Sequence, residues 1–136
     1  MEIKNDDLNE VIAFLSTFTM PRTVARANSK FVGHLKERLQ ELIDNEKELV
    51  ESFGGTVDDG GHISGLDNEK LDEFQAERKQ LLSETATIEP DYKEQFSILK
   101  SFFDGWDGEV SPSSYKGMNA LYDALDTIGD VDAGEK

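Results

Sequence analysis

The sequence predicts a mainly α-helical protein, a single domain of four or five helices. Apolar residues recur every three or four positions along most of the 136-residue chain, which is the spacing of an amphipathic helix. The longest such run predicts one helix over about residues 22–52. Strand-forming residues flank a turn signal in one short stretch, about 56–63, and predict a small β-hairpin there. We expect the helical domain to span 1–128, followed by a flexible acidic tail over 129–136.

The first helix is expected to begin after Asn5 or Asp6, either of which can cap it. Its apolar residues follow at helical spacing and are Leu8, Val11, Ile12 and Leu15. The helix should end before Pro21, because a residue preceding proline is disfavoured in the α conformation. Pro21 itself suits the first turn of the next helix.

The second helix has the clearest pattern, from about Arg22 to Ser52. Its apolar residues are Phe31, Val32, Leu35, Leu39, Leu42, Ile43, Leu49, Val50 and Phe53. Gly54 is a typical terminator. Such a helix would be about 45 Å long. That exceeds the width of a domain of this size, so it must either bend near Asn28 or Gly33 or project from the domain.

The residues after this helix predict a hairpin and a third helix. Asp59-Gly60 is a turn pair between two strand-forming dipeptides. Asp67 or Asn68 can cap the third helix, whose apolar residues are Leu71, Phe74, Leu81 and Leu82. We expect 84–87 to be the frayed end of this helix.

The fourth predicted helix, beginning near Asp91, carries apolar residues on two adjacent faces. A helix of this kind is either central in the fold or half of an interface. The candidate self-association residues are Phe96, Phe102, Phe103 and Trp106. With the long second helix beside them, they predict a homodimer. Ser111-Pro112 is a good start for the last helix, which should reach Ile128.

Composition excludes several functional classes. The chain has no cysteine, so neither disulfides nor thiolate metal sites are available to it. No stretch approaches the roughly 18 apolar residues of a membrane span, and the first residues do not resemble a secretion signal. We therefore expect a cytosolic protein. A net charge of −15 repels phosphates and anionic lipids, so the expected partners have basic surfaces and direct nucleic-acid binding is not expected.

Charge is distributed unevenly along the chain. Residues 11–36 contain no acidic side chain, and Arg22, Arg26 and Lys30 fall four residues apart, so that they form a basic stripe on a helix. This stripe either docks an acidic partner or a phosphate backbone, or offsets the negative charge of the chain internally, the last being favoured. The candidate acidic ridge on the second and third helices consists of Asp44, Glu48, Glu51, Asp72 and Glu73. It is either a solvated face or a surface that mimics nucleic acid.

No constellation points to catalysis, to a cofactor or to a metal. The loop 56–67 resembles a calcium loop superficially, but Thr56 holds the first position, Gly60 the fifth, and Asp67 the twelfth in place of the bidentate Glu that calcium binding needs. His34 is three residues before Glu37, which is a common helical pairing. Nucleotide-binding loops and nucleophile elbows are absent. We expect a protein that is not an enzyme.

Several segments together resemble a family of unknown function, small acidic proteins of tailed phages that infect Gram-positive bacteria. The segments are LNEVIAFL, PRTVARANSKFVGHLKERLQELIDNEKELVESFGG, TVDDGGHI, DEFQAERKQLLSETATIE and SSYKGMNALYDAL. The resemblance implies a viral accessory role and brings no assigned active site, cofactor or partner. The first hypothesis is a phage protein that binds and inhibits a host protein in the host cytoplasm, such as a defence or nucleic-acid-handling factor. The alternative is a virion-assembly or tail-associated factor that acts by self-association.

Overall fold

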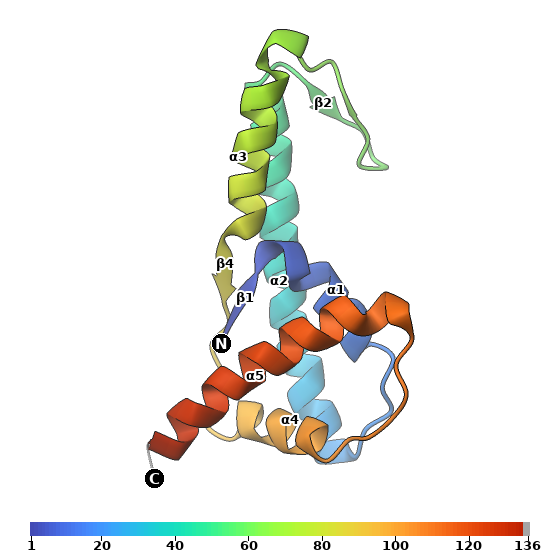
Figure 1. Ribbon diagram of the computed structural model, residues 1–136, viewed down its shortest axis with the longest axis vertical. Coiled ribbons are helices and arrows are strands. Elements are labelled where there is room, and N and C mark those ends of the chain that lie inside the picture. Colours follow the sequence, from blue (N-terminus) through green and yellow to red (C-terminus); the bar gives the residue numbers. More distant parts are fainter. Residues whose placement is uncertain (135–136) are drawn as a thin grey trace.

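The computed structural model describes residues 1–134, and the side chains of residues 1–128 (Figure 1). The described chain contains five α-helices and two small antiparallel sheets, which confirms the mainly helical fold with one long helix. The elements in order are β1 (Glu2–Lys4), α1 (Leu8–Leu15), α2 (Arg22–Ser52), β2 (Thr56–Val57), β3 (Ile63–Ser64), α3 (Leu71–Ser83), β4 (Thr85–Thr87), α4 (Gln95–Asp104) and α5 (Tyr115–Gly134). Short 3-10 turns lead directly into α1, α3 and α5.

The long helix α2 belongs to two regions of the molecule. Its first half packs with α1, α4, α5 and the β1–β4 sheet in a region that we call the body, residues 1–39 and 84–134. Its second half projects from the body beside α3 and the β2–β3 hairpin, and we call this region, residues 40–83, the arm (Figure 1). Of the two ways to accommodate so long a helix, the structure therefore has the projecting one.

The body holds the main hydrophobic core, which draws on every helix except α3. Its buried residues are Ile3, Leu8, Val11, Ile12, Phe14, Leu15, Ala27, Phe31, Leu35, Ala86, Ile88, Phe96, Leu99, Phe103, Leu121, Ala124 and Leu125. Helices α1 and α5 cross so closely that a Cβ atom at Gly117 would overlap the carbonyl group of Glu10. The crossing therefore requires glycine at this position.

A buried glutamine joins α2 to the segment before α4. Gln95 has no exposed surface, and its Nε2 donates to the carbonyl of Ala27 at 3.1 Å while its Oε1 accepts from the backbone N–H of Asp91 at 2.6 Å. Both ends of the amide are thus hydrogen-bonded, as a buried polar group requires.

The β1–β4 sheet was not predicted. Thr85–Thr87, expected as the frayed end of a helix, is strand β4 and pairs with β1 so that Ile3 lies opposite Ala86. The N–H of Ile88 extends the ladder by donating to the carbonyl of Met1 at 2.7 Å. Both strands are short, and burial of Ile3 and Ala86 in the core outweighs the weak strand signal of three residues.

The arm has a small core of its own. Phe53 and Phe74 meet edge to face with ring centroids 5.8 Å apart, and Val50 is buried beside them. The hairpin lies so close to α2 that a Cβ atom at Gly55 would contact Leu66 and Val50. The predicted hairpin is therefore confirmed and is supported by packing against α2.

Two predicted boundaries differ from the observed ones. Helix α4 begins at Gln95, four residues after Asp91, because Asp91 is held by Gln95 in a turn. Helix α5 continues to Gly134, so most of the predicted tail is helical backbone, and residues 135–136 lie outside the described residues. A glycine inside a helix costs only about 1 kcal/mol, which explains why Gly129 does not end α5.

Candidate functional site

The exposed side of α2 carries a line of mainly charged residues that runs from the body to the arm. Residues three or four positions apart share one side of a helix. The members of this line, which we call the outer stripe, are Arg22, Arg26, Lys30, Gly33, Glu37, Gln40, Asp44, Glu48 and Glu51, and all of them are exposed. The opposite side of α2 is buried through Ala27, Phe31, Leu35, Leu42 and Val50. The outer stripe is therefore a face that contacts solvent along the whole helix.

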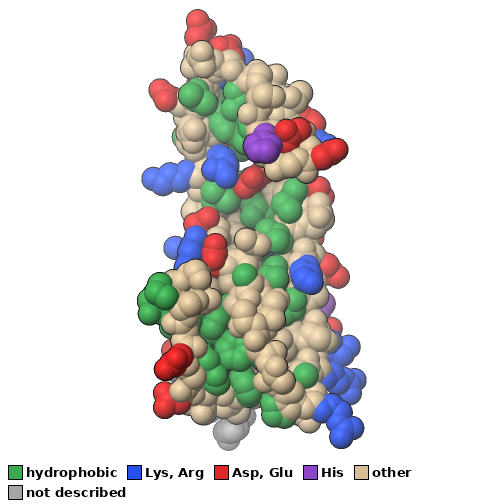
Figure 2. All heavy atoms as spheres, turned by 90° about the vertical axis from the view of Figure 1, so that its right-hand side faces the viewer, with side chains coloured by type: hydrophobic (Ala, Val, Ile, Leu, Met, Phe, Trp, Pro, Cys, Tyr) green, Lys and Arg blue, Asp and Glu red, His purple; other side chains and the backbone are tan. Residues whose placement is uncertain are grey.

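The outer stripe changes sign along the helix. Its first half is basic and its second half is mainly acidic, with Lys36 and Lys47 exposed on the same side, and the first turn of α2 has no acidic residue while the last turn has no basic one. In Figure 2, Lys and Arg side chains gather at the lower end of the molecule, where α2 begins. This direction opposes the helix macrodipole, which favours anions at the N-terminus and cations at the C-terminus. Helix stability therefore does not explain the charge order.

Gly33 lies in the outer stripe between the two charged halves. A Cβ atom at this position would meet nothing within 4 Å, so packing within the protein does not require glycine there. Glycine in an exposed helix interior costs about 1 kcal/mol relative to alanine. What the missing side chain does provide is room for the close approach of another molecule to the helix backbone.

The basic half of the stripe contacts the segment before α4. The guanidinium carbon of Arg26 lies 6.0 Å from the ring centroid of Tyr92, and His34 Nε2 lies 3.0 Å from Asp91 Oδ1. The hydrogen bond from His34 lowers the pKa of Asp91, and the charge of Lys30 acts in the same direction. Asp91 thus pairs with His34, which lies beside the stripe, and is influenced by the charge of Lys30 within it.

The five residues of the predicted acidic ridge do not share one surface. Asp44, Glu48 and Glu51 lie in the outer stripe, on the side of α2 directed away from α3. Asp72 and Glu73 are exposed on α3, which packs against α2 through Phe74 and Arg78. Because the two helices turn their buried sides toward each other, their exposed sides face apart. The candidate acidic surface is therefore the second half of the outer stripe, which also includes Glu37.

Two of the predicted self-association residues are in the interior. Phe96 and Phe103 are 5% and 1% exposed, and Phe103 lies in a cluster of aromatic rings with Phe14, Phe18 and Tyr122. The Tyr122 hydroxyl donates to the Phe103 carbonyl at 2.8 Å, and burial raises the pKa of Tyr122. Phe102 and Trp106 are half-buried on the rim of this cluster. Helix α4 is apolar on two faces because it packs against both α2 and α5.

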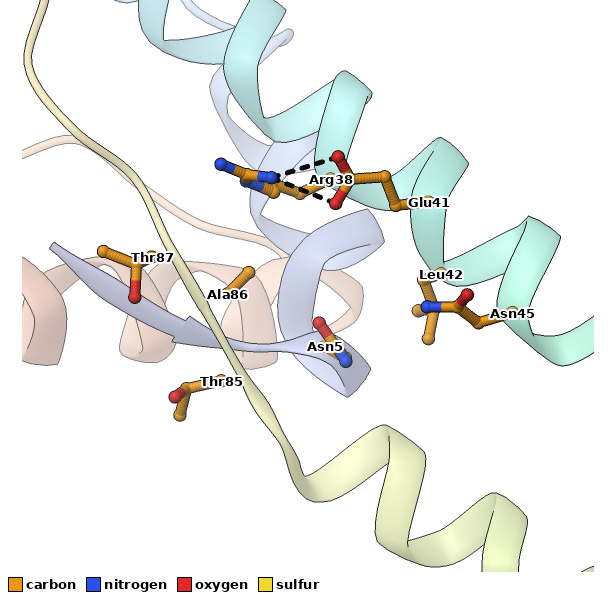
Figure 3. A pocket seen from close by; sticks show the side chains of 8 residues that line it. All are labelled: Asn5, Arg38, Glu41, Leu42, Asn45, Thr85, Ala86 and Thr87. Carbon is orange, nitrogen blue, oxygen red and sulfur yellow. Dashed lines mark hydrogen bonds and ion pairs between the residues drawn. The ribbon is translucent and has the colours of Figure 1, made fainter.

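A polar pocket lies where the arm joins the body (Figure 3). It is lined by Asn5, Arg38, Glu41, Leu42, Asn45, Thr85, Ala86 and Thr87 and has a volume of about 320 Å³. Arg38 Nη1 donates to both carboxylate oxygens of Glu41 at 3.0 Å, as the dashed lines show. Asn5 Nδ2 donates to the carbonyl of Leu81 at 2.9 Å and so ties the first turn of the chain to α3. These contacts give the pocket a structural role at the junction.

The remaining candidates from the sequence have local partners. In the hairpin, Asp58 Oδ1 accepts from the backbone N–H groups of Gly60 and His62 at 2.9 and 2.8 Å, so this carboxylate closes the turn. Among the described residues, no group of three or more side chains is arranged to hold a metal ion. Within the same part of the chain, no helix is long and apolar enough to cross a membrane.

The chain matches no family model, no curated protein and no solved structure.

Proposed function

We propose that this protein is a non-enzymatic binding protein whose acidic half of the outer stripe docks on a basic surface of a partner protein. The observation that carries the proposal is the charge order of α2, which runs against the helix macrodipole. Proteins retain locally unfavourable features mainly where function requires them. Gly33 supports the same conclusion, since its cost to the helix is not repaid inside the protein.

The arm concentrates negative charge where it extends farthest from the body. Residues 40–83 contain twelve acidic and four basic side chains, a net charge of −8 on about a third of the chain. A projecting surface of one sign steers a partner of opposite sign during diffusion and raises the association rate. The partner class is therefore a protein with a basic groove or patch, of the kind that nucleic-acid-handling proteins use.

The biological setting is part of the proposal. The resemblance of several segments to small acidic phage proteins supports an accessory protein that inhibits a host factor in the host cytoplasm. Assembly by self-association is the alternative, and burial of Phe96 and Phe103 removes two of the four side chains on which it was based.

The test compares three charge-reversed variants of the tagged protein in capture experiments from host lysate, followed by affinity measurement with the captured protein. Asp44→Lys, Glu48→Lys and Glu51→Lys together should abolish capture, and the wild-type affinity should fall steeply with added salt. Asp72→Lys with Glu73→Lys on α3 is the matched control and should retain capture.

The third variant reverses the basic half through Arg22→Glu, Arg26→Glu and Lys30→Glu. Capture should survive this change. Loss of capture here, with retention in the Asp44, Glu48 and Glu51 variant, would mean that the basic half is the docking face and would contradict the proposal.

A further inference from the structure

An apolar groove opens on the arm between α2, the β2–β3 hairpin and α3. Its volume is about 440 Å³, and its apolar lining consists of Ile43, Leu49, Val50, Val57, Ile63 and Phe74. Ile43 is 50% exposed and Ile63 is 40% exposed, which makes them two of the four large apolar side chains exposed among residues 1–128. Figure 2 views the molecule from the side of the hairpin and shows hydrophobic side chains at the surface of the arm, among acidic ones.

The sequence pattern assigned Ile43 to the buried side of α2, and the structure corrects this. Successive residues on a helix are rotated by about 100°, so Ile43 points about a quarter turn away from its buried neighbour Leu42. It lies between the buried side and the outer stripe. A single exposed apolar side chain is common, but Ile43 and Ile63 line the same groove, and contiguous exposed apolar surface of this kind is typical of an interaction site.

The edge of the groove carries three acidic and two basic side chains, a net charge of −1. Glu46, Asp58 and Asp59 line it, together with Lys47 and Arg78. Arg78 Nη2 lies 3.9 Å from Glu46 Oε1, so this pair is close to neutral as a unit. The two negative charges of Asp58 and Asp59, at the hairpin turn, then exceed the single positive charge of Lys47. The groove therefore favours a ligand that combines an apolar group with positive charge.

We propose that this groove anchors a segment of the partner protein in which an apolar side chain, branched or aromatic, is flanked by lysines or arginines. The inference rests on the proposed function, because the groove borders the acidic half of the outer stripe. Ile43 in the groove is adjacent to Asp44 in the outer stripe, and Lys47, one turn after Ile43, also lines the groove. One partner segment lying along α2 therefore covers both the groove and the acidic half of the stripe. Charge complementarity then steers the encounter, and burial of the apolar side chain slows dissociation.

A second copy of this chain does not have the required chemistry. Besides Ile43 and Ile63, the large apolar side chains exposed within residues 1–128 are Leu71 and Tyr115. Leu71 is followed by two acids, and Tyr115 lies beside Lys116, which is paired with Asp6 at 3.2 Å. Two chains of charge −15 also repel each other. The occupant is therefore a different, basic protein.

The test uses two short synthetic peptides and the full chain. In the first peptide, one tryptophan and one leucine are flanked by lysines; in the second, serine replaces both apolar residues and the charge is unchanged. Each is fluorescein-labelled and titrated with the protein by anisotropy. The first should bind at least about tenfold more tightly than the second.

Methyl NMR locates the binding site without any substitution. With isoleucine methyl groups labelled, the first peptide should shift the signals of Ile43 and Ile63 and leave those of Ile3 and Ile88, buried in the body, in place. Ile43→Ser should then weaken the first peptide about tenfold and leave the second unaffected. Leu71→Ser is the matched control, because Leu71 is 37% exposed on the arm and lies outside the groove lining.

Any one of three results would overturn the proposal that the groove binds a partner segment. These are equal affinity for the two peptides, no binding of the first peptide, or no shift of the methyl signals of Ile43 and Ile63. The combined substitution Asp44→Lys and Glu48→Lys separates the two proposals. If it leaves the affinity for both peptides unchanged while Ile43→Ser lowers the affinity for the first peptide, the groove proposal is supported and the acidic face is not a docking surface. If it lowers the affinity for both peptides equally and Ile43→Ser lowers neither affinity, the acidic face is supported as a docking surface and the groove proposal is wrong.

Discussion

The body and the arm share one continuous helix but are stabilised very differently. Seventeen buried apolar residues form the core of the body, whereas the apolar side chains buried in the arm are Leu42, Val50 and Phe74. The arm also carries the greater density of negative charge, and mutual repulsion opposes its compact state. A region with few buried contacts unfolds locally more readily than a region with a large core. The difference suggests that the body provides folding stability and the arm provides a surface.

The largest expected effects come from truncating one buried side chain in each region. Leu35→Ala in the body should lower the free energy of unfolding by about 2–5 kcal/mol, because it removes a fully buried side chain from the main core. Phe74→Ala should act on the arm, since it removes the ring that Phe53 contacts. Urea unfolding and amide hydrogen exchange measure the two effects.

Hydrogen exchange gives the sharper comparison. Phe74→Ala should accelerate exchange in α3 and in the second half of α2 while the amides of α1 and α5 stay protected. Equal loss of protection in both regions would show that the arm and the body unfold as one unit and would remove the distinction between them.

Two helix glycines provide the next comparison. Gly117→Ala should destabilise the protein by about 1–3 kcal/mol or more, because the added methyl group overlaps the Glu10 carbonyl and the two helices must separate. Gly33→Ala should stabilise it by up to about 1 kcal/mol, since alanine is the better helix former and the site is open. Thermal and urea unfolding of both variants measure the difference in sign.

The substitution Gly33→Ala also tests the docking face. If Gly33 allows a partner to approach α2 closely, Gly33→Ala should weaken partner capture even though it stabilises the fold. Capture at wild-type level by a more stable protein would mean that Gly33 has no part in docking.

The smallest expected effect is a pH dependence in the body. The hydrogen bond from His34 lowers the pKa of Asp91 in the folded state below its ordinary value of 3.8. The contact therefore contributes its full stabilisation above that value, and the contribution is lost as the pH falls through the lowered pKa of the folded state. Asp91→Asn should lose less stability than the wild type over this acidic range, as measured by thermal unfolding. Asp72→Asn, the same change of charge on the arm, should follow the wild-type profile.

Much of the fold could be predicted from local patterns. The bounds of α2 agree because its apolar spacing, Pro21 and Gly54 are all local signals, and the hairpin agrees because Asp59-Gly60 specifies a turn. The β1–β4 pairing could not be predicted, since each strand has three residues and their sequence separation exceeds 80 positions. The one sign of it was the isolated apolar residue Ile3 between charged neighbours, which also fits a helix.

The candidate site divides in the same way. Composition and order along the chain determined the charge of each half of α2, and helical periodicity alone aligns the outer stripe. Only the tertiary structure decided that Asp72 and Glu73 face away from that stripe, that Phe96 and Phe103 are interior, and that Ile43 and Ile63 line one groove. The physical reason is that periodicity defines which residues share a side of one helix, while burial depends on which segments distant in the sequence pack against that side.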